Sequence, residues 1–305
     1  MSIQKNHILT LIILLVFCNV IAQDSFQTVI AKNGDGIFSV LRDQGMDVVK
    51  YYSDFVNLNE SKIKDGSYLI IGEEYLIPHA PDSFKNMGVK IQLPNKKERP
   101  IFEGELGSLI RIDSSLQNTV YYLITNNGVN GLSKKPQDDI AMRMARKLIQ
   151  RCARVYMLNN PANNSLDLID FTSEVNKRYL KHTGDYQRLL VIKTDNILAN
   201  KKTNVSVYHY AESKEGKKMA DNILKIIDKN SIKHMSVEDY SKVFTDFKDV
   251  SFAKNILPAI TFIEMGTGIS QNEKSFQISS NKKSIADLIT NGLLSDYSKL
   301  DFEDN

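Results

Sequence analysis

Between residues 119 and 294, short segments that read as β-strands alternate with longer segments that read as α-helices. The strand-like segments are apolar and rich in β-branched residues, whereas the helix-like segments carry apolar residues three or four positions apart. This alternation is typical of a mostly parallel sheet flanked by helices, so we predict an α/β fold for this part of the chain. The expected strands are 119–125, 154–158, 188–194, 204–210 and 258–264, and the expected helices are 138–150, 166–181, 214–228 and 282–294.

The carboxyl ends of the expected strands carry the residues of greatest chemical interest, because ligands of parallel sheets bind beyond those ends. Lys193 lies at the end of one strand, and Glu264 ends another whose preceding residues are apolar or β-branched. An ionised carboxylate beside such a buried strand needs a partner, since burying an unpaired charge is very costly. From the residues alone, the partner of Glu264 is a metal ion, a cationic side chain or water.

The first residues have the layout of a signal peptide. Lys5 precedes the apolar run 8–17, and Val20 and Ala22 stand at the positions that favour cleavage before Gln23. The apolar run is too short for a comfortable membrane span. We therefore expect residues 1–22 to be removed from an exported protein, periplasmic or extracellular, that keeps no membrane span. An uncleaved membrane anchor and a lipoprotein signal at Cys18 are the alternatives.

Composition limits the classes of function. The 305 residues are 42% hydrophobic and 25% charged, which is ordinary for a globular protein with a large domain and a small one. The formal net charge of +3 comes from 39 basic and 36 acidic residues, so charge does not point to nucleic acid. No segment has the pattern of a glycine-rich phosphate loop. Once residues 1–22 are removed, Cys152 has no cysteine to pair with, so we expect no internal disulfide.

Residues 26–78 read as a strand, two helices and a second strand, with Asn33-Gly34-Asp35-Gly36 as a turn before the first helix. This order, with "GD" early and "IGEEYLIP" at the end, resembles a lysin-motif (LysM) module. The resemblance implies binding of peptidoglycan or another N-acetylglucosamine-containing glycan. The implied groove residues are Asp35, Gly36 and Ile37 on one side and Ile63, Lys64 and Asp65 on the other. For Asp35, the alternative is that its carboxylate only caps the following helix.

The remaining boundaries follow from composition. Residues 79–98 are polar and contain several prolines, so we expect a linker there, with one short strand in "VKIQL". We assign residues 99–295 to the large α/β domain and residues 296–305 to a polar tail.

The large domain contains, in this order, "LQNTVYYLI", "MARKLI" followed by "ARVYML", "SKEGKKMA" and "LPAITFIEMG". In these segments it is similar to the zinc-dependent N-acetylmuramoyl-L-alanine amidases. The resemblance implies a family that cuts the bond between muramic acid and the first alanine of the stem peptide. It also implies a zinc ion held by two histidines and a glutamate, with a second glutamate as general acid/base.

The sequence departs from that family at the metal site. Asn127 and Lys193 stand where the family has histidines, and Asp138, next to Asp139, stands near the metal-binding glutamate, whereas Glu264 matches the catalytic glutamate. Asparagine is a poor zinc ligand and an ammonium group is none. We therefore expect no zinc and no cofactor, and a Lys193–Glu264 ion pair in the space of the zinc, joined by Asp138. The alternatives are a Lys193 side chain that bends into solvent and a zinc site rebuilt from other histidines.

We thus expect an exported peptidoglycan-binding protein of the amidase family that is a pseudoenzyme, with a wall hydrolase as a conceivable partner. One alternative is an active amidase with an atypical metal site. Another is a structural or protein-interaction module of the cell envelope.

Overall fold

The computed structural model describes residues 26–63, 68–80, 83, 87–92, 99–100, 109–126, 140–159, 167–195, 202–232, 240–266, 275–279 and 282–298. The chain divides into two compact units. One comprises Met1–Leu41 with Val48–His79, and the other comprises Arg42–Asp47 with Ala80–Asn305. None of the helices in the described part of the chain is long and apolar enough to cross a membrane.

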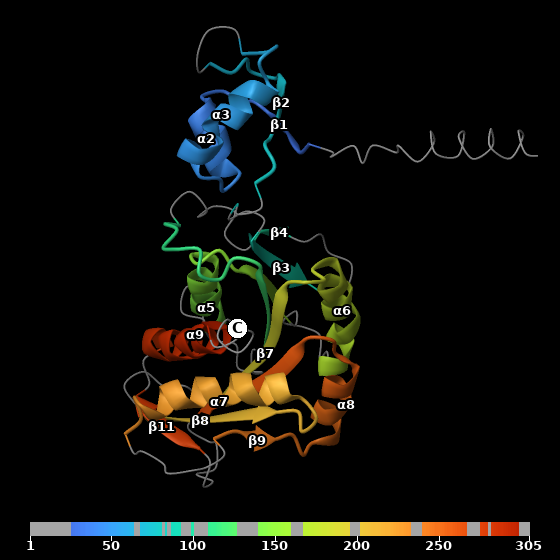
Figure 1. Ribbon diagram of the computed structural model, residues 1–305, viewed down its shortest axis with the longest axis vertical. Coiled ribbons are helices and arrows are strands. Elements are labelled where there is room, and N and C mark those ends of the chain that lie inside the picture. Colours follow the sequence, from blue (N-terminus) through green and yellow to red (C-terminus); the bar gives the residue numbers. More distant parts are fainter. Residues whose placement is uncertain are drawn as a thin grey trace, which may run out of the picture. The chain divides into compact units, whose positions relative to one another are not determined.

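The small unit has the expected order of strand, helix, helix and strand: β1 (Thr28–Ile30), α2 (Ile37–Asp43), α3 (Val48–Leu58) and β2 (Glu74–Leu76) (Figure 1). The two strands pair antiparallel, with Val29 opposite Tyr75. Asn59 connects the end of α3 to β2, because its Nδ2 donates to the carbonyls of Phe55 and Leu76, and its Oδ1 accepts from the Leu76 amide. These bonds satisfy a buried side-chain amide and fix the second strand against the helices.

The large unit is built on a nine-stranded sheet. Eight of its strands follow the order β11-β8-β10-β7-β5-β6-β3-β4, and the ninth, β9, pairs with β8. The strands from β3 to β10 in this order are parallel, whereas β8, β11 and β4 run antiparallel to their neighbours on the main path. The strand bounds are β3 (Gly88–Gln92), β4 (Arg99–Pro100), β5 (Thr119–Asn126), β6 (Arg154–Asn159), β7 (Tyr186–Asp195), β8 (Lys202–His209), β9 (Lys242–Val243), β10 (Ala259–Gly266) and β11 (Phe276–Ser279).

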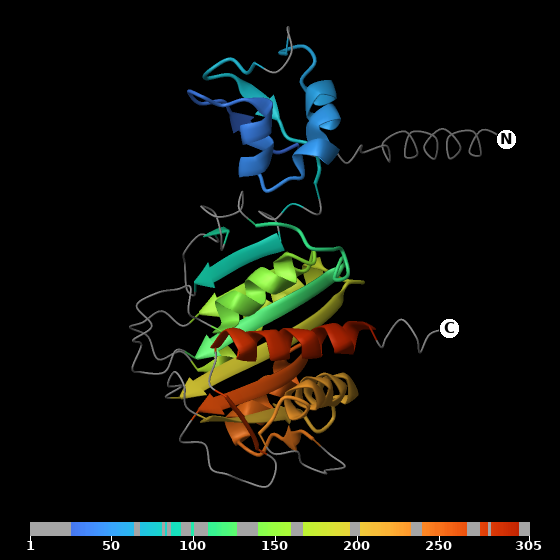
Figure 2. The ribbon, with the colours of Figure 1, turned by 90° about the vertical axis from the view of Figure 1, so that its left-hand side faces the viewer.

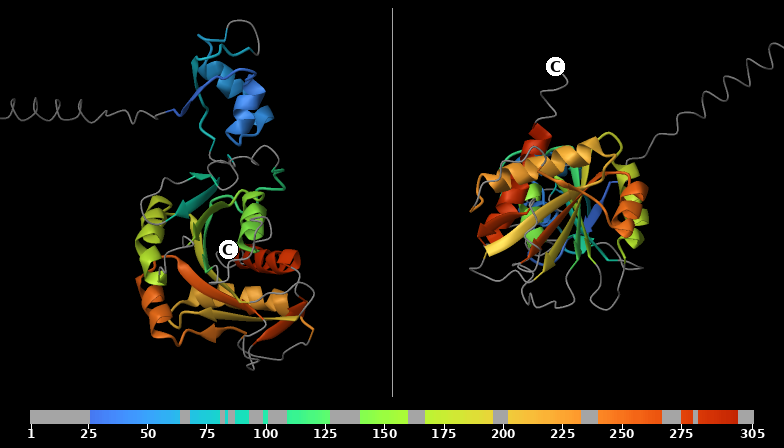
Figure 3. Two further views of the ribbon diagram at one scale, coloured as in Figure 1. Left: turned by 180° about the vertical axis from the view of Figure 1, so that it is seen from behind. Right: turned by 90° about the horizontal axis from the view of Figure 1, so that it is seen from below.

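Helices cover both faces of this sheet. On one face lie α5 (Ile140–Ile149), α7 (Lys214–Asp228) and α9 (Lys282–Ser298), and Figure 2 shows α9, in red, lying over the strands. On the other face lie the 3-10 helix η3 (Leu168–Phe171), α6 (Thr172–Lys181) and α8 (Phe247–Asn255), as Figure 3 shows from behind and from below. The molecule therefore has the predicted α/β architecture of a mostly parallel sheet between helices.

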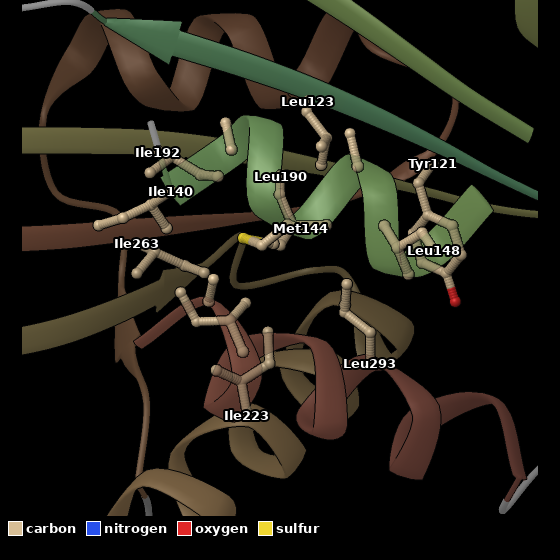
Figure 4. Close-up of a cluster of buried hydrophobic side chains, with 14 of the residues drawn as sticks. Tyr121, Leu123, Ile140, Met144, Leu148, Leu190, Ile192, Ile223, Ile263 and Leu293 are labelled. Carbon is tan, nitrogen blue, oxygen red and sulfur yellow. The ribbon is translucent and has the colours of Figure 1, made fainter. Parts of the chain in front are cut away.

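Each face of the sheet has its own apolar layer, because successive side chains of a strand point to opposite faces. On β7, Leu190 and Ile192 pack toward α5, α7 and α9, in the cluster of Figure 4. Leu189 and Val191 pack instead with Phe171 and Phe252 under η3 and α8. The buried strands are thus apolar on both faces, as parallel strands usually are.

Several elements differ from the expectation. The strand expected within the linker is β3, and it pairs in parallel with β6 as a member of the large sheet. The last helix continues to Ser298, so it includes the start of the segment that we expected to be a polar tail. In that extension Asp296 is fully buried, and its Oδ2 lies 3.3 Å from Nε of Arg188. Helix α8 and strand β11 were not predicted.

Candidate functional site

A pocket of about 600 Å³ opens at the carboxyl ends of β5, β7 and β10, under η3 and the first turn of α8. This is the edge of a parallel sheet at which ligands bind. Its walls are apolar where Ile124 and Val191 emerge from the sheet and where Leu168 and Phe171 cover them. Its polar lining includes Lys193, Asp249, Glu264, Asp167, Asp246 and Lys248.

Strand register brings two of the predicted site residues together. Glu264 of β10 lies directly opposite Lys193 of β7, and both side chains project from the same face of the sheet. The Lys193 Nζ lies 3.6 Å from the Glu264 Oε1, and the two side chains are 29% and 30% exposed. The expected ion pair is therefore confirmed, and the Lys193 side chain stays over the sheet, with its Nζ 4.8 Å from the centre of the Phe262 ring.

A third charged group joins the pair from α8. The Lys193 Nζ lies 3.3 Å from the Asp249 Oδ2. The helix starts at this place because the carboxylate of Asp246 accepts from the amides of Lys248 and Asp249 as an N-cap. Burial raises the pKa of Asp249, while the neighbouring Lys193 ammonium acts in the opposite direction. Asp138, which we expected in this role, lies outside the described residues, as does Asn127.

Sequence reasoning missed Asp249 because α8 has a weak apolar pattern, with only Phe252 and Ala253 of its residues buried. A local signal was nevertheless present. Asp249 follows Asp246 by three residues. This is the spacing of a helix N-cap, here Asp246, and an acidic residue in the first turn, here Asp249.

Glu264 also contacts β8 on the side away from Lys193. Burial, together with the charge of Glu264 and a hydrogen bond to it, raises the pKa of Tyr208 to about 12. The phenol therefore stays protonated at neutral pH and donates to the Glu264 carboxylate. Lys242 approaches the same strand, and its Nζ donates to Ser206 Oγ at 3.2 Å.

The described residues of this pocket do not fit a zinc ion. A catalytic zinc site needs three protein ligands, commonly neutral imidazole and carboxylate. Here an ammonium group stands between the two carboxylates of Asp249 and Glu264, where it offers no lone pair to a metal ion. Within the described ranges, no group of three or more histidine, cysteine, aspartate or glutamate side chains is arranged to hold a metal ion.

The histidines of the described sheet and helices serve other contacts. His182 Nε2 lies 2.7 Å from the Tyr156 hydroxyl, and burial lowers the pKa of His182 to about 4. His209 Nδ1 lies 3.0 Å from Ser241 Oγ, which itself donates to Asp221 Oδ1 at 2.7 Å. These three residue types also make up hydrolase triads, but here the serine lies between the other two and both Ser241 and His209 are buried. We read this cluster as structural.

In the small unit, three of the residues predicted to line a glycan groove, Asp35, Gly36 and Ile37, lie at the start of α2. The Asp35 Oδ2 accepts from the Lys32 amide at 2.8 Å, so this carboxylate closes the preceding turn and does not cap the helix. Gly36 makes an isolated bridge to Tyr68, whose side chain is 86% exposed. Ile37 is fully buried, so a glycan contact at this position is limited to its backbone. Ile63 is half-buried, and Lys64 and Asp65 lie outside the described residues.

Comparison with models of protein families found no matching family, and comparison with curated proteins found no matching protein. Solved structures do match. An N-acetylmuramoyl-L-alanine amidase from Clostridium difficile 630 has a TM-score of 0.37 and 16% identity, over 61% of this chain and 100% of that one. An N-acetylmuramoyl-L-alanine amidase of Nostoc punctiforme has a TM-score of 0.35 and 14% identity, over 58% of this chain and 96% of that one.

A metallo-carboxypeptidase from Burkholderia cenocepacia also matches, with a TM-score of 0.37 and 10% identity, over 60% of this chain and 57% of that one. At such low TM-scores and identities, we base no inference on these similarities.

Proposed function

We propose that this protein is an exported, wall-associated peptidoglycan-binding protein whose large unit is an amidase-like domain without hydrolase activity. The motifs that carry the resemblance fall on β5, α5, β6, α7 and β10 in the expected order. Glu264 stands at the carboxyl end of β10, which is where the resemblance puts the general acid/base. Asn127, Asp138 and Lys193 stand at the positions of the lost metal ligands.

The observation that carries the loss of activity is the Lys193 ammonium group between Asp249 and Glu264. Hydrolysis of an amide by this family requires a metal ion that polarises the carbonyl and lowers the pKa of a bound water. Lys193 supplies a positive charge in the same region but cannot coordinate water.

Attachment to the wall is assigned to the small unit. Its strand-helix-helix-strand order and the exposed Tyr68 beside Gly36 support a glycan site around Asp35, Gly36, Ile37 and Ile63, completed by Lys64 and Asp65. Residues 1–22 would direct export, and a wall hydrolase is the protein partner that an inactive amidase-like domain would suit.

Two assays test this proposal. The purified chain should sediment with purified sacculi, and Asp35→Ala should weaken that binding more than the matched exposed change Asp54→Ala. The chain should release no stem peptide from the same sacculi, with or without added zinc, under conditions in which an active amidase does. Release of stem peptide that chelators abolish would show an active amidase instead. Failure to sediment would favour a module that contacts other proteins of the envelope.

A further inference from the structure

The described lining of the pocket beside Lys193 carries more negative than positive charge. Its described lining has four carboxylates and two ammonium groups. Lys248 and Asp167 pair with each other across the rim at 3.1 Å, and Asp246 is engaged as the N-cap of α8. Deeper in, a single ammonium group serves both Asp249 and Glu264. Among the described lining residues, the two inner carboxylates therefore outnumber the one inner ammonium group, while Lys242 lies outside this lining, on the β8 side, where its Nζ donates to Ser206 Oγ at 3.2 Å.

The inner carboxylates have acceptor capacity left. Each ionised carboxylate offers about four lone-pair positions. Lys193 meets one oxygen of each at 3.3 Å and 3.6 Å, and the Tyr208 phenol takes a further position on Glu264. The Asp249 and Glu264 side chains are 19% and 30% exposed, and both line the pocket. An incoming cation can thus reach them, whereas an incoming anion would lie beside two carboxylates.

The rest of the pocket is apolar and large enough for a small ligand. Ile124, Val191, Leu168 and Phe171 form its walls, and its volume of about 600 Å³ is within the range of small-molecule sites. These walls suit an aliphatic chain, because apolar surface gains from leaving water. At the rim, Phe247 is 84% exposed. The site therefore combines an apolar channel with an anionic end.

We propose that this pocket binds a primary ammonium group carried on an aliphatic chain, as the diamino residue of a peptidoglycan stem peptide presents it. The ammonium group takes the acceptor positions of Asp249 and Glu264 that Lys193 leaves open, and the aliphatic chain lies along Ile124 and Val191. The chemistry of the ligand follows from the pocket, whereas its assignment to a stem peptide rests on the proposed function. The large unit then binds the peptide of the wall, and the small unit binds its glycan.

The test is a calorimetric titration of the purified chain with two probes, N-acetyl-L-Ala-γ-D-Glu-L-Lys and the same peptide with norleucine in place of lysine. The probes differ only in the ammonium group. We expect the lysine peptide to bind at least about tenfold more tightly, which corresponds to about 1.4 kcal/mol. Equal affinities, or no binding of either the lysine peptide or cadaverine, would overturn the inference without requiring any variant to fold.

Variants locate the site. Asp249→Asn and Glu264→Gln should each weaken binding of the lysine peptide about fivefold or more, and neither should change binding of the norleucine peptide. Glu215→Gln, which removes the same charge from an exposed position on α7 over the opposite face of the sheet, should leave the affinity unchanged. An equal effect of Glu215→Gln would mean that only net charge matters, and would overturn the proposed site.

Two further measurements separate this inference from the proposed function. If cadaverine binds and the lysine peptide does not, the source of the amine is not a stem peptide and that assignment is overturned. If the chain sediments with sacculi but discriminates no amine, the pocket inference fails and the proposed function stands. If it binds the lysine peptide but does not sediment with sacculi, the pocket inference is supported and wall attachment is refuted.

Discussion

Lys193 and Glu264 lie opposite each other on the neighbouring parallel strands β7 and β10, with the Nζ of one 3.6 Å from the Oε1 of the other. The same Nζ lies 3.3 Å from the Asp249 Oδ2, so one ammonium group contacts two carboxylates that line a pocket. Parallel strands that end together present such residues as neighbours without any contribution from loops. Strand register therefore fixes the Lys193–Glu264 pair, and α8 adds Asp249 to it.

Replacing Lys193 by methionine should destabilise the protein at neutral pH. Asp249 and Glu264 would lose their shared cation and repel each other, at a cost of about 1 kcal/mol for this partly exposed cluster. The loss should shrink as pH falls, because protonation of the carboxylates removes the repulsion. Urea unfolding at several pH values measures both effects. Lys193→Arg keeps the charge and should behave nearly as the native chain does, and an equal loss in that variant would mean that packing matters instead.

Residues that lie on regular strands were the predictable part of this site. The apolar segments 188–194 and 258–264 fixed the positions of Lys193 and Glu264 at strand ends, and their meeting followed from the parallel arrangement. The direction of β8 also follows from the sequence, although we did not predict it. Only residues 196–201 separate β7 from β8, and a parallel connection needs a dozen residues or more, so β8 must run antiparallel to β7.

Residues on short polar elements were not predictable in the same way. Asp249 reaches Lys193 because α8 packs over the end of the sheet, and this packing depends on the distant contact of Phe252 with the apolar layer of Phe171 and Val191. Nothing within residues 247–255 specifies that partner. The burial of Asp296 likewise depends on Arg188, Tyr186 and Asn222, which are far away in the sequence.

Gly292→Ala should be strongly destabilising, because it places a methyl group between α9 and α7. An added Cβ would lie 2.6 Å from the Cα of Ile223, and backbone cannot move aside as a flexible side chain can. We expect a loss of about 2 kcal/mol or more in the free energy of unfolding. The matched variant Asn291→Ala changes the exposed neighbour on the same helix and should stay within about 0.5 kcal/mol of the native chain. Equal effects in a urea denaturation would contradict the close approach.

His182 should make the large unit less stable in acid. Burial, with Arg154 and Lys181 nearby, lowers the pKa of His182 from 6.5 to about 4 in the folded chain. Below pH 6.5 the unfolded chain therefore binds more protons at His182 than the folded chain does. The contribution of His182 to the free energy of unfolding is fully present above pH 6.5 and is lost as pH falls toward 4. It is worth about 1–2 kcal/mol after allowance for solvent screening.

The His182 contribution can be isolated by comparing the pH dependence of unfolding in the native chain and in His182→Gln. Glutamine keeps polar atoms near the Tyr156 hydroxyl but does not titrate, so the variant's curve should be flatter between pH 6.5 and 4. A proton NMR titration of the imidazole gives the pKa directly. A value near that of an exposed histidine would show that His182 pairs with Asp185 as a cation, at the 3.8 Å separation seen here, and would reverse the argument.

Zinc should not stabilise the native chain, because a catalytic zinc site needs three protein ligands and the Lys193 ammonium group beside Asp249 and Glu264 offers no lone pair. A ligand that binds the folded state raises its stability in proportion to the logarithm of its concentration, so the unfolding temperature reports binding directly. We expect no change with micromolar zinc or with chelator in the native chain. Lys193→His places an imidazole beside the two carboxylates, a donor set that suits zinc, and this variant should gain stability with zinc and lose the gain with chelator. A zinc-dependent rise in the native chain, absent from Lys193→His, would mean that lysine belongs to a metal site and does not replace one.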